Sequence, residues 1–282
     1  MSRNHLSPLV RDFFERVERE IVPTIVSATV PFYAVQNDAI VRDRSGVLLQ
    51  VGDEHFILTA SHDLKAIVDN NIYLYVGWCE DQLVPVPIPD AVFHTSEEHS
   101  RDVAVVKLSP DSSKKILSSA KPISLRSVGR ECTDEPAFYL VSGYPREWLR
   151  VFPDRIESAP LNYLCRIYEG DALPLEKFEY DSKLHLLLEL SRDGKKITSA
   201  DDTPIPSKSG IKGISGCGVW RIVGYSPNAM KDWQPEQVSL VGIEHRYWEK
   251  QGAVAATRIQ HVLAFLAGGF PNLLPAMNIV YP

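Results

Sequence analysis

Short apolar runs recur along most of the chain and predict a protein built mainly of β-strands. In the first half, Val47–Val51 is followed by Gly52 and Asp53 and then by the run His55–His62. Gly-Asp between two apolar runs is typical of a tight turn, so the two runs are predicted to form a hairpin. The same half holds a predicted helical turn at Asp63–Val68 and predicted strands at Ile72–Trp78, at Val84–Ile88, where prolines indicate a sheet edge, and at Val103–Leu108.

A second set of strands is predicted beyond a polar connection. Residues 109–131 are rich in serine and lysine and contain no long apolar run, which indicates a crossing between two half-domains. The strands predicted after it are Ala137–Pro145, Leu161–Ile167, Leu184–Leu190, Val219–Val223, Val238–Ile243 and Ala255–Arg258. Turns or loops are predicted at Asp193–Gly194, at Thr203–Ser209 and, as a long surface hairpin tip, at Tyr225–Pro235.

Both ends of the chain show helical patterns. Apolar residues recur at helical spacing over Ser7–Glu20, with proline at the first helical position and Pro23 as the expected stop. This amphipathic helix is expected to pack on the outside of the body. A second helix is predicted over Ile259–Leu266, ending at Gly268–Gly269. The tail, Phe270–Pro282, is apolar with three prolines and is expected to lie extended on the body.

Composition narrows the functional classes. The chain has 282 residues, 44% of them hydrophobic, which suffices for one or two domains with a sizeable core. A net charge of −6 argues against a dedicated nucleic-acid binder. No apolar stretch is long enough to cross a membrane, and the N-terminus lacks a signal-peptide pattern. We therefore expect a cytoplasmic protein that binds neither nucleic acid nor membrane.

The four cysteines, at positions 79, 132, 165 and 217, are widely spaced. They form no C-x-x-C pair and no zinc-ligand pattern, so free buried thiols are expected. No metal and no cofactor is predicted.

Candidate chemistry begins at a serine framed by glycines. Ser215 lies between Gly213 and Gly216, and an apolar run follows it. Glycine allows the backbone to adopt positive φ or another atom to approach closely. A serine held in such a turn can expose its hydroxyl while neighbouring N–H groups point at one place, which is the geometry of an oxyanion hole. Taken alone, such strings are mostly ordinary turns.

Two upstream stretches give this serine chemical partners. His62 ends the run that begins at His55, and Asp102 stands before the apolar run that ends at Leu108. A serine hydroxyl is a poor nucleophile unless an imidazole takes its proton and a carboxylate orients that imidazole. Each residue alone has an ordinary interpretation, as a strand-end histidine, a turn aspartate and a loop serine. The order His62, Asp102, Ser215 supplies the complete set. The histidines at 55, 94, 99 and 185 have no such context and are expected to be structural or solvated.

Three short motifs in this order resemble those of the chymotrypsin/trypsin-like serine peptidases, of the intracellular, bacterial type. They are Leu58–His62, Asp102–Val106 and Gly213–Cys217, and the resemblance extends from about Val41 to Phe265. It implies an all-β fold of two six-stranded antiparallel barrels with an N-terminal and a C-terminal helix. It also implies a catalytic triad of His62, Asp102 and Ser215, with the backbone N–H groups of Gly213 and Ser215 as the oxyanion hole. The expected division is residues 1–24 as a helical extension, 25–120 as the half carrying His62 and Asp102, 121–269 as the half carrying Ser215, and 270–282 as a tail.

Departures from the family pattern affect activation and specificity. Ile214 stands where secreted members have an aspartate that pairs with a newly cut N-terminus, so no activation at Glu20–Val22 is expected. Ser209, six residues before Ser215, is uncharged where members that cut after Lys or Arg have an acid. Cys217 is expected to be buried and not to be the nucleophile. Candidates for the wall of the substrate cleft are Ser209, Glu244, His245 and Arg246.

The resemblance therefore implies a trypsin-like serine endopeptidase that acts on a protein or peptide substrate and is regulated or latent, with a regulatory protein as a partner. The alternative is a catalytically inactive scaffold or binding module on the same fold. An α/β-hydrolase esterase is disfavoured, because that class needs Gly-x-Ser-x-Gly and places the serine before the histidine.

Overall fold

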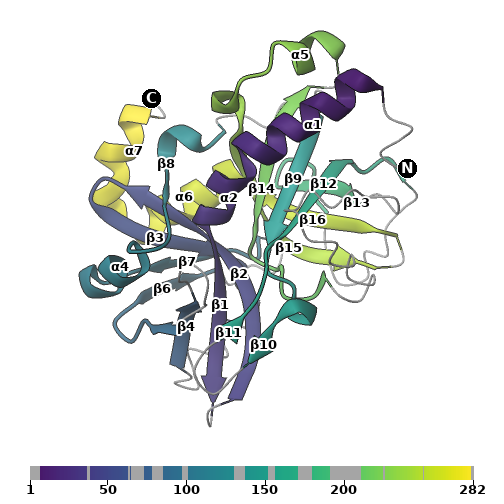
Figure 1. Ribbon diagram of the computed structural model, residues 1–282. Helices are drawn as coiled ribbons and strands as arrows, with labels where there is room; N and C mark the ends of the chain where they lie inside the picture. Colours follow the sequence, from purple (N-terminus) through teal and green to yellow (C-terminus); the bar gives the residue numbers. More distant parts are fainter. Residues whose placement is uncertain are drawn as a thin grey trace.

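The computed structural model describes residues 7–36, 39–62, 64, 73–77, 85–96, 101–129, 137–151, 156–170, 180–190, 211–224, 226–249 and 251–280. Two β-structures lie side by side, and helices cover their upper and outer surfaces (Figure 1). The predicted all-β fold class with helices near both ends is confirmed. Of the two predicted six-stranded barrels, the second is a closed barrel of six strands, and the described strands of the first half form an eight-stranded sheet.

The first sheet contains the strands of the N-terminal half in the order β5-β4-β1-β2-β3-β7-β6. The short strand β8 pairs in parallel with β2. The hairpin predicted around Gly52 is confirmed as β2–β3, and β5 lies at the end of the sheet as its prolines indicated. The strands are β1 (Thr29–Gln36), β2 (Ala39–Val51), β3 (Glu54–Thr59), β4 (Tyr73–Gly77), β5 (Pro85–Pro87), β6 (Val92–Thr95), β7 (Ala104–Lys107) and β8 (Ile123–Ser124).

The second sheet closes into a six-stranded barrel in the order β12-β13-β16-β15-β14-β9. A separate small hairpin is formed by β10 and β11. The strands are β9 (Ala137–Gly143), β10 (Arg150–Val151), β11 (Ile156–Glu157), β12 (Leu161–Ile167), β13 (His185–Leu190), β14 (Gly218–Gly224), β15 (Ser239–Trp248) and β16 (Ala253–Arg258).

Alternation along the strands fills two interiors and the seam between them. In β3, Phe56 and Leu58 pack into the cluster that joins the two sheets and the helices, whereas Ile57 packs into the first sheet's own core. Both faces of β3 are therefore buried. Cys217 and Val219 point into the barrel interior. The turns that end β3 and precede β14 are thus held on rigid, fully packed strands.

The predicted N-terminal helix is confirmed as α1 (Pro8–Glu20), whose buried face includes Phe13 and Val17. Pro23 does not end the helical region, because it lies in the first turn of α2 (Val22–Ala28), where no N–H donor is needed. The polar connection is also more structured than predicted, since it contains α4 (Pro110–Ile116). Further helical segments are α6 (Ile259–Gly269), which confirms the predicted C-terminal helix, and the 3-10 turns η2 (Leu125–Ser127), η3 (Arg146–Trp148), η5 (Pro235–Gln237) and η6 (Pro271–Leu273).

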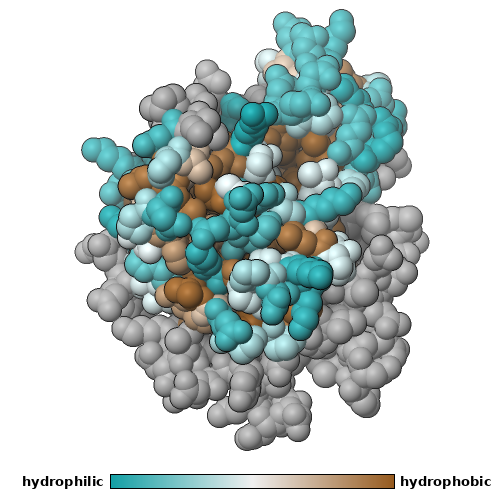
Figure 2. Space-filling model, turned by 90° about the vertical axis from the view of Figure 1, so that its left-hand side faces the viewer, coloured by the Kyte–Doolittle hydropathy of each residue, from teal (hydrophilic) through white to brown (hydrophobic). Residues whose placement is uncertain are grey.

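The prediction of an extended C-terminal tail was wrong. The tail forms η6 and then α7 (Leu274–Val280), with Leu273 and Met277 buried in the cluster between the sheets. Pro271 and Pro275 occupy the beginnings of these helical segments, where proline is favoured. The face that carries α7, turned toward the viewer in Figure 2, shows its apolar residues in separate patches between hydrophilic ones. No helix in the described part of the chain is long and apolar enough to span a membrane.

The hairpin tip predicted at 225–235 contains a helix, α5 (Pro227–Lys231), which lies against α1 in Figure 1. Its N-cap is Ser226, whose hydroxyl accepts the Ala229 N–H. Trp233 follows it, fully buried, with its ring edge-on to Phe13 at 5.5 Å. Its indole N–H donates to the Ile222 carbonyl at 3.2 Å. Trp233 therefore fastens the tip to the N-terminal helix.

Replacement of Trp233 by alanine is expected to lower the free energy of unfolding by about 3–5 kcal/mol, the usual cost of removing a fully buried aromatic side chain. Urea unfolding followed by circular dichroism measures the change. Lys231→Ala, at an exposed position of the same helix, is the control and should stay within about 0.5 kcal/mol of the wild type. A loss below about 1 kcal/mol for Trp233→Ala would show that α1 and the tip are not coupled.

Candidate active site

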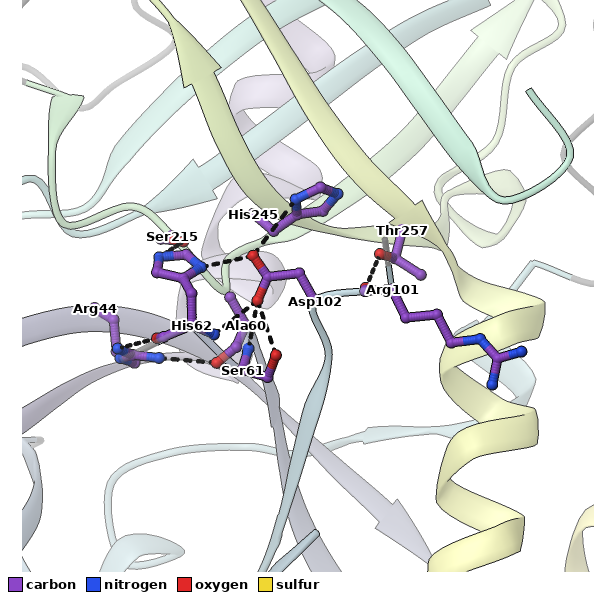
Figure 3. A network of polar contacts seen from close by, with 9 residues as sticks. All are labelled: Arg44, Ala60, Ser61, His62, Arg101, Asp102, Ser215, His245 and Thr257. Carbon is purple, nitrogen blue, oxygen red and sulfur yellow. Dashed lines mark hydrogen bonds and ion pairs between the residues drawn. The ribbon is translucent and has the colours of Figure 1, made fainter. Parts of the chain in front are cut away.

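The predicted triad residues lie together at the seam between the two sheets (Figure 3). His62 follows β3 and Asp102 precedes β7, and the pairing of Thr59 with Ala104 brings these ends together. Asp102 Oδ2 lies 2.7 Å from His62 Nδ1. His62 Nε2 lies 3.1 Å from the hydroxyl of Ser215, which comes from the other sheet.

Asp102 is held as an ionised acceptor. Its Oδ1 accepts hydrogen bonds from the Ser61 N–H at 2.9 Å, the Ser61 hydroxyl at 3.0 Å and the His62 N–H at 2.7 Å. Burial opposes its ionisation, but the hydrogen bond and charge of His62 and the nearby His245 hold the pKa of Asp102 well below its ordinary value. Its φ of +39° is rare for a residue with a side chain, and such strain is found where a fold over-determines a functional position.

Arg44 also belongs to this site, although no sequence pattern predicted it. Arg44 is buried on β2, and its guanidinium donates to the carbonyl of Ala60 at 2.8 Å and to that of His62 at 2.7 Å. These bonds fix the turn that carries His62. The alternation of β2 gives no signal for this role, because a charged residue on a strand is ordinarily on the solvent face.

The serine loop is attached to the first sheet through Ser45. The Ser45 N–H donates to the Ser215 carbonyl at 2.8 Å, and its hydroxyl donates to the Gly213 carbonyl at 3.1 Å. Gly213 and Gly216 have φ of +97° and +90°, as their glycine identity predicted. The Gly216 N–H donates to the Glu244 carbonyl at 2.7 Å, which ties the loop to β15 as well.

Two peptide groups of this loop have fixed directions. The Lys212 carbonyl accepts from the Arg146 N–H at 2.6 Å, and the Ile214 carbonyl accepts from the Cys217 N–H at 2.9 Å. In a trans peptide the N–H points opposite to the carbonyl, so the N–H groups of Gly213 and Ser215 point away from these partners. Within the described part of the chain, neither N–H has an acceptor of its own. Among the described residues, both donors are therefore unpaired.

The site opens into a cavity of about 400 Å³, whose lining includes His62, Ser215 and the three predicted cleft residues Glu244, His245 and Arg246. Ser209, the fourth predicted cleft residue, lies outside the described residues. Glu244 and His245 are 1% and 4% exposed, so they are not the open charged wall that was expected. His245 instead lies against the triad, with Nδ1 3.7 Å from Asp102 Oδ2.

Other residues singled out in the sequence have structural positions. Cys165 and Cys217 are free and buried as expected, and burial raises the pKa of both thiols, which disfavours Cys217 as a nucleophile. His94 stacks on Phe265 with ring centroids 4.2 Å apart, and His185 is fully buried. Cys79, Cys132, His99, the turn at 193–194 and the loop at 203–209 lie outside the described residues. Across the described ranges, no group of three His, Cys, Asp or Glu side chains is arranged to hold a metal ion.

The neighbouring side chains Glu244 and His245 make stability depend on pH in opposite directions. Burial, reinforced by the charge of Asp102, raises the pKa of Glu244 from 4.5 to about 8. Burial lowers the pKa of His245 from 6.5 to about 3. The folded Glu244 therefore retains a proton between pH 4.5 and 8 that the unfolded chain releases, and stability falls as pH rises through this window. Folded His245 excludes a proton that the unfolded chain takes up, so stability falls as pH drops from 6.5 to 3.

These two effects oppose one another between pH 4.5 and 6.5. The free energy of unfolding therefore declines above pH 6.5 and below pH 4.5, with slopes up to about 1.4 kcal/mol per pH unit. Urea unfolding at a series of pH values should show that Glu244→Gln removes the decline between pH 6.5 and 8. His245→Gln should remove much of the decline below pH 4.5. Glu249→Gln, at an exposed position, is the control. An unchanged alkaline slope in Glu244→Gln would contradict the burial of an unionised carboxyl.

Comparison with known proteins relates this geometry to a fold. No protein-family model and no curated protein matches the sequence. A scabies mite inactivated protease paralogue is 16% identical, with 88% of this chain and 96% of that chain covered and a TM-score of 0.50. A Glu endopeptidase is 12% identical, with 90% and 93% covered and a TM-score of 0.49. A serine endoprotease from Yersinia pestis is 16% identical with a TM-score of 0.49; 88% of this chain is covered, but only 64% of that chain.

Sequence identities this low show a shared fold and nothing about activity. One of the proteins with this fold is named as an inactivated protease. The closed barrel, the second sheet and the likeness to the scabies mite paralogue together give the chain a chymotrypsin-like fold.

Proposed function

We propose that the protein is a serine endopeptidase in which Ser215 is the nucleophile, His62 the general base and acid, and Asp102 the group that orients His62. The observation that carries this proposal is the continuous hydrogen-bonded series from Ser215 Oγ through both ring nitrogens of His62 to Asp102. The two bonds, at 3.1 and 2.7 Å, are within the range that proton transfer requires.

In the proposed reaction, Ser215 Oγ attacks the carbonyl carbon of a peptide bond while His62 Nε2 takes the hydroxyl proton. The tetrahedral intermediate collapses, the C–N bond breaks, and His62 returns the proton to the leaving amine. Water then attacks the acyl-enzyme with His62 as base, which releases the acid and restores Ser215. Asp102 remains ionised and stabilises the imidazolium form of His62 at each stage.

The N–H groups of Gly213 and Ser215 are the proposed donors to the oxyanion. Their support is the fixed direction of the two preceding carbonyls, since a donor that needs no rearrangement stabilises developing charge most effectively. His62 and Asp102 would belong to the unit 25–120 and Ser215 to the unit 121–269. Ile214 is buried among apolar side chains, so activation by a new N-terminus pairing at this position is not part of the proposal.

A fluorophosphonate probe tests the proposal, because it phosphonylates only a serine whose hydroxyl is activated, with fluoride as the leaving group. Mass spectrometry of the purified chain should find the label on Ser215. The label should be absent in Ser215→Ala and retained in Ser226→Ala, a control serine at the exposed cap of α5.

Other outcomes separate the remaining possibilities. Labelling that needs an added peptide or partner protein would indicate a latent enzyme under regulation. An absence of labelling under all conditions, with the chain folded, would overturn the proposed catalysis in favour of a binding module on the same fold.

A further inference from the structure

An ion pair joins the two sheets beside the proposed oxyanion hole. Asp43 lies on β2 of the first sheet, and Arg146 begins η3, which follows β9 of the barrel. Oδ1 of Asp43 accepts from Nε of Arg146 at 2.5 Å and also pairs with Nη2. The side chain of Asp43 is 6% exposed, whereas that of Arg146 is 53% exposed. The pair therefore links a nearly buried carboxylate to a half-exposed guanidinium, and both residues line the cavity.

The backbone of Arg146 holds the peptide group that presents the Gly213 N–H. The Arg146 N–H donates to the Lys212 carbonyl at 2.6 Å, and this carbonyl belongs to the same peptide group as the Gly213 N–H. Two restraints in turn fix the position of Arg146. One is the turn of η3, in which the Leu149 N–H donates to the Arg146 carbonyl at 3.0 Å. The other is the side-chain bond to Asp43, which comes from the other sheet.

The second oxygen of Asp43 lies against the same peptide group. A Cβ built on Gly213 would overlap Oδ2 of Asp43, so this oxygen packs directly on the Gly213 backbone. Oδ2 is buried and has no hydrogen-bond partner in the described part of the chain. A carboxylate at this place repels the negative charge that forms on a substrate oxygen bound to the Gly213 N–H. The guanidinium of Arg146 offsets this repulsion, because its positive charge is paired with the carboxylate.

Two other cations that line the cavity have different surroundings. Arg44 follows Asp43 on β2, and successive side chains of a strand point to opposite faces. Its guanidinium donates to the carbonyls of Ala60 and His62, at the turn that carries the proposed base. The side chain of Lys212 is exposed to solvent. Arg146 is therefore the cation that the described structure pairs with Asp43.

We propose that Asp43 and Arg146 are a positioning pair for the oxyanion hole. The pair holds the peptide group between Lys212 and Gly213 in the orientation that stabilises the transition state, and the guanidinium cancels the charge of the carboxylate beside it. This inference deepens the proposed peptidase function and rests on it. Because the two side chains come from different sheets, the orientation of the oxyanion donor depends on the seam between the sheets.

Removal of the positive charge tests the pair by kinetics. Arg146→Gln keeps the backbone N–H but leaves Asp43 without its cation. It should lower kcat for a fluorogenic peptide roughly 10- to 100-fold with little change in KM, because the oxyanion forms only in the transition state. The matched control is Arg166→Gln, since Arg166 is 54% exposed and pairs with Glu189 on the neighbouring barrel strand. The control should keep the kcat of the wild type. A wild-type kcat in Arg146→Gln would overturn the proposal.

A double variant tests whether the two side chains act together. Asp43→Asn removes the repelling charge along with the ion pair, so alone it should lower kcat less than Arg146→Gln does. Adding Asp43→Asn to Arg146→Gln should raise kcat at least about threefold over Arg146→Gln alone, since the uncompensated carboxylate is gone. Losses that multiply in the double variant would show that the two side chains act independently, which would refute a positioning pair.

Amide hydrogen exchange keeps this inference separate from catalysis. In Ser215→Ala, the Arg146 N–H should be protected by its bond to the neighbouring carbonyl. Adding Asp43→Asn should speed its exchange at least about tenfold, whereas the Gly216 N–H, which is bonded to β15, should keep its rate. Unchanged protection of the Arg146 N–H would refute the positioning role even if the fluorophosphonate labels Ser215. Faster exchange at Arg146, with no labelling of the wild type, would refute the catalysis and leave the positioning role in place.

Discussion

Replacement of Asp102 by asparagine is expected to lower kcat/KM about 10⁴-fold at neutral pH while the chain stays folded. The reason lies in the two oxygens of Asp102, which have different partners. Oδ1 faces three donors, from the backbone and hydroxyl of Ser61 and the backbone of His62. The amide nitrogen of an asparagine cannot sit among three donors, so the amide oxygen must take this place.

The amide nitrogen is then forced into the position of Oδ2, 2.7 Å from His62 Nδ1 in the wild type. As a donor, it requires Nδ1 to be an acceptor, which places the ring proton on Nε2. An Nε2–H cannot take the proton of Ser215, so the imidazole is held in the wrong tautomer. The geometry of the triad would be preserved and its chemistry lost.

Steady-state kinetics with a fluorogenic peptide and the rate of fluorophosphonate labelling should both report this loss. Asp111→Asn, at an exposed position of α4, provides the control and should match the wild type. A rate for Asp102→Asn within tenfold of the wild type would mean that the carboxylate does not set the tautomer of His62. The proposed role of Asp102 would then be wrong.

The sequence predicted the parts of the site that depend on short-range patterns. His62 follows one apolar strand and Asp102 precedes another. Residues at the ends of neighbouring strands can contact each other, so their positions in the sequence predicted that these two side chains could meet. The glycines around Ser215 predicted positive φ angles, and both Gly213 and Gly216 have them. Here the local backbone requirement and the residue identity carry the same information.

Long-range contacts decided what the sequence could not predict. The bonds of Arg44 to the carbonyls of Ala60 and His62 depend on how β2 lies against the end of β3. The link from Ser45 to the serine loop depends on how the two sheets pack against each other. Trp233 lies in the predicted surface hairpin tip, but its burial depends on α1, more than two hundred residues earlier in the chain. Glu244 was expected as a charge on the cleft wall. Its position on β15 is instead buried, which only the barrel's closure determines.

Replacement of Gly213 by alanine is expected to lower kcat/KM about 10²–10³-fold, as removal of one oxyanion donor does. At φ of +97° an alanine is strained. Its Cβ would also lie 2.8 Å from the Arg146 N and 3.0 Å from the Tyr144 carbonyl oxygen, and would overlap the Asp43 carboxylate. Because the Arg146 N–H is the donor that fixes the Lys212 carbonyl, relief of these contacts must turn the peptide that presents the Gly213 N–H.

Backbone strain alone must be separated from loss of this donor, and Gly52 allows it. Gly52 has φ of +60° in the β2–β3 turn, and a Cβ there would meet nothing within 4 Å. Gly52→Ala should therefore cost about 1 kcal/mol of stability without changing kcat/KM. If Gly213→Ala retained full activity and labelling, the Gly213 N–H would not be an oxyanion donor. If Gly52→Ala reduced activity equally, the effect would come from destabilisation, whereas loss in Gly213→Ala alone would place the oxyanion at the peptide held by Arg146.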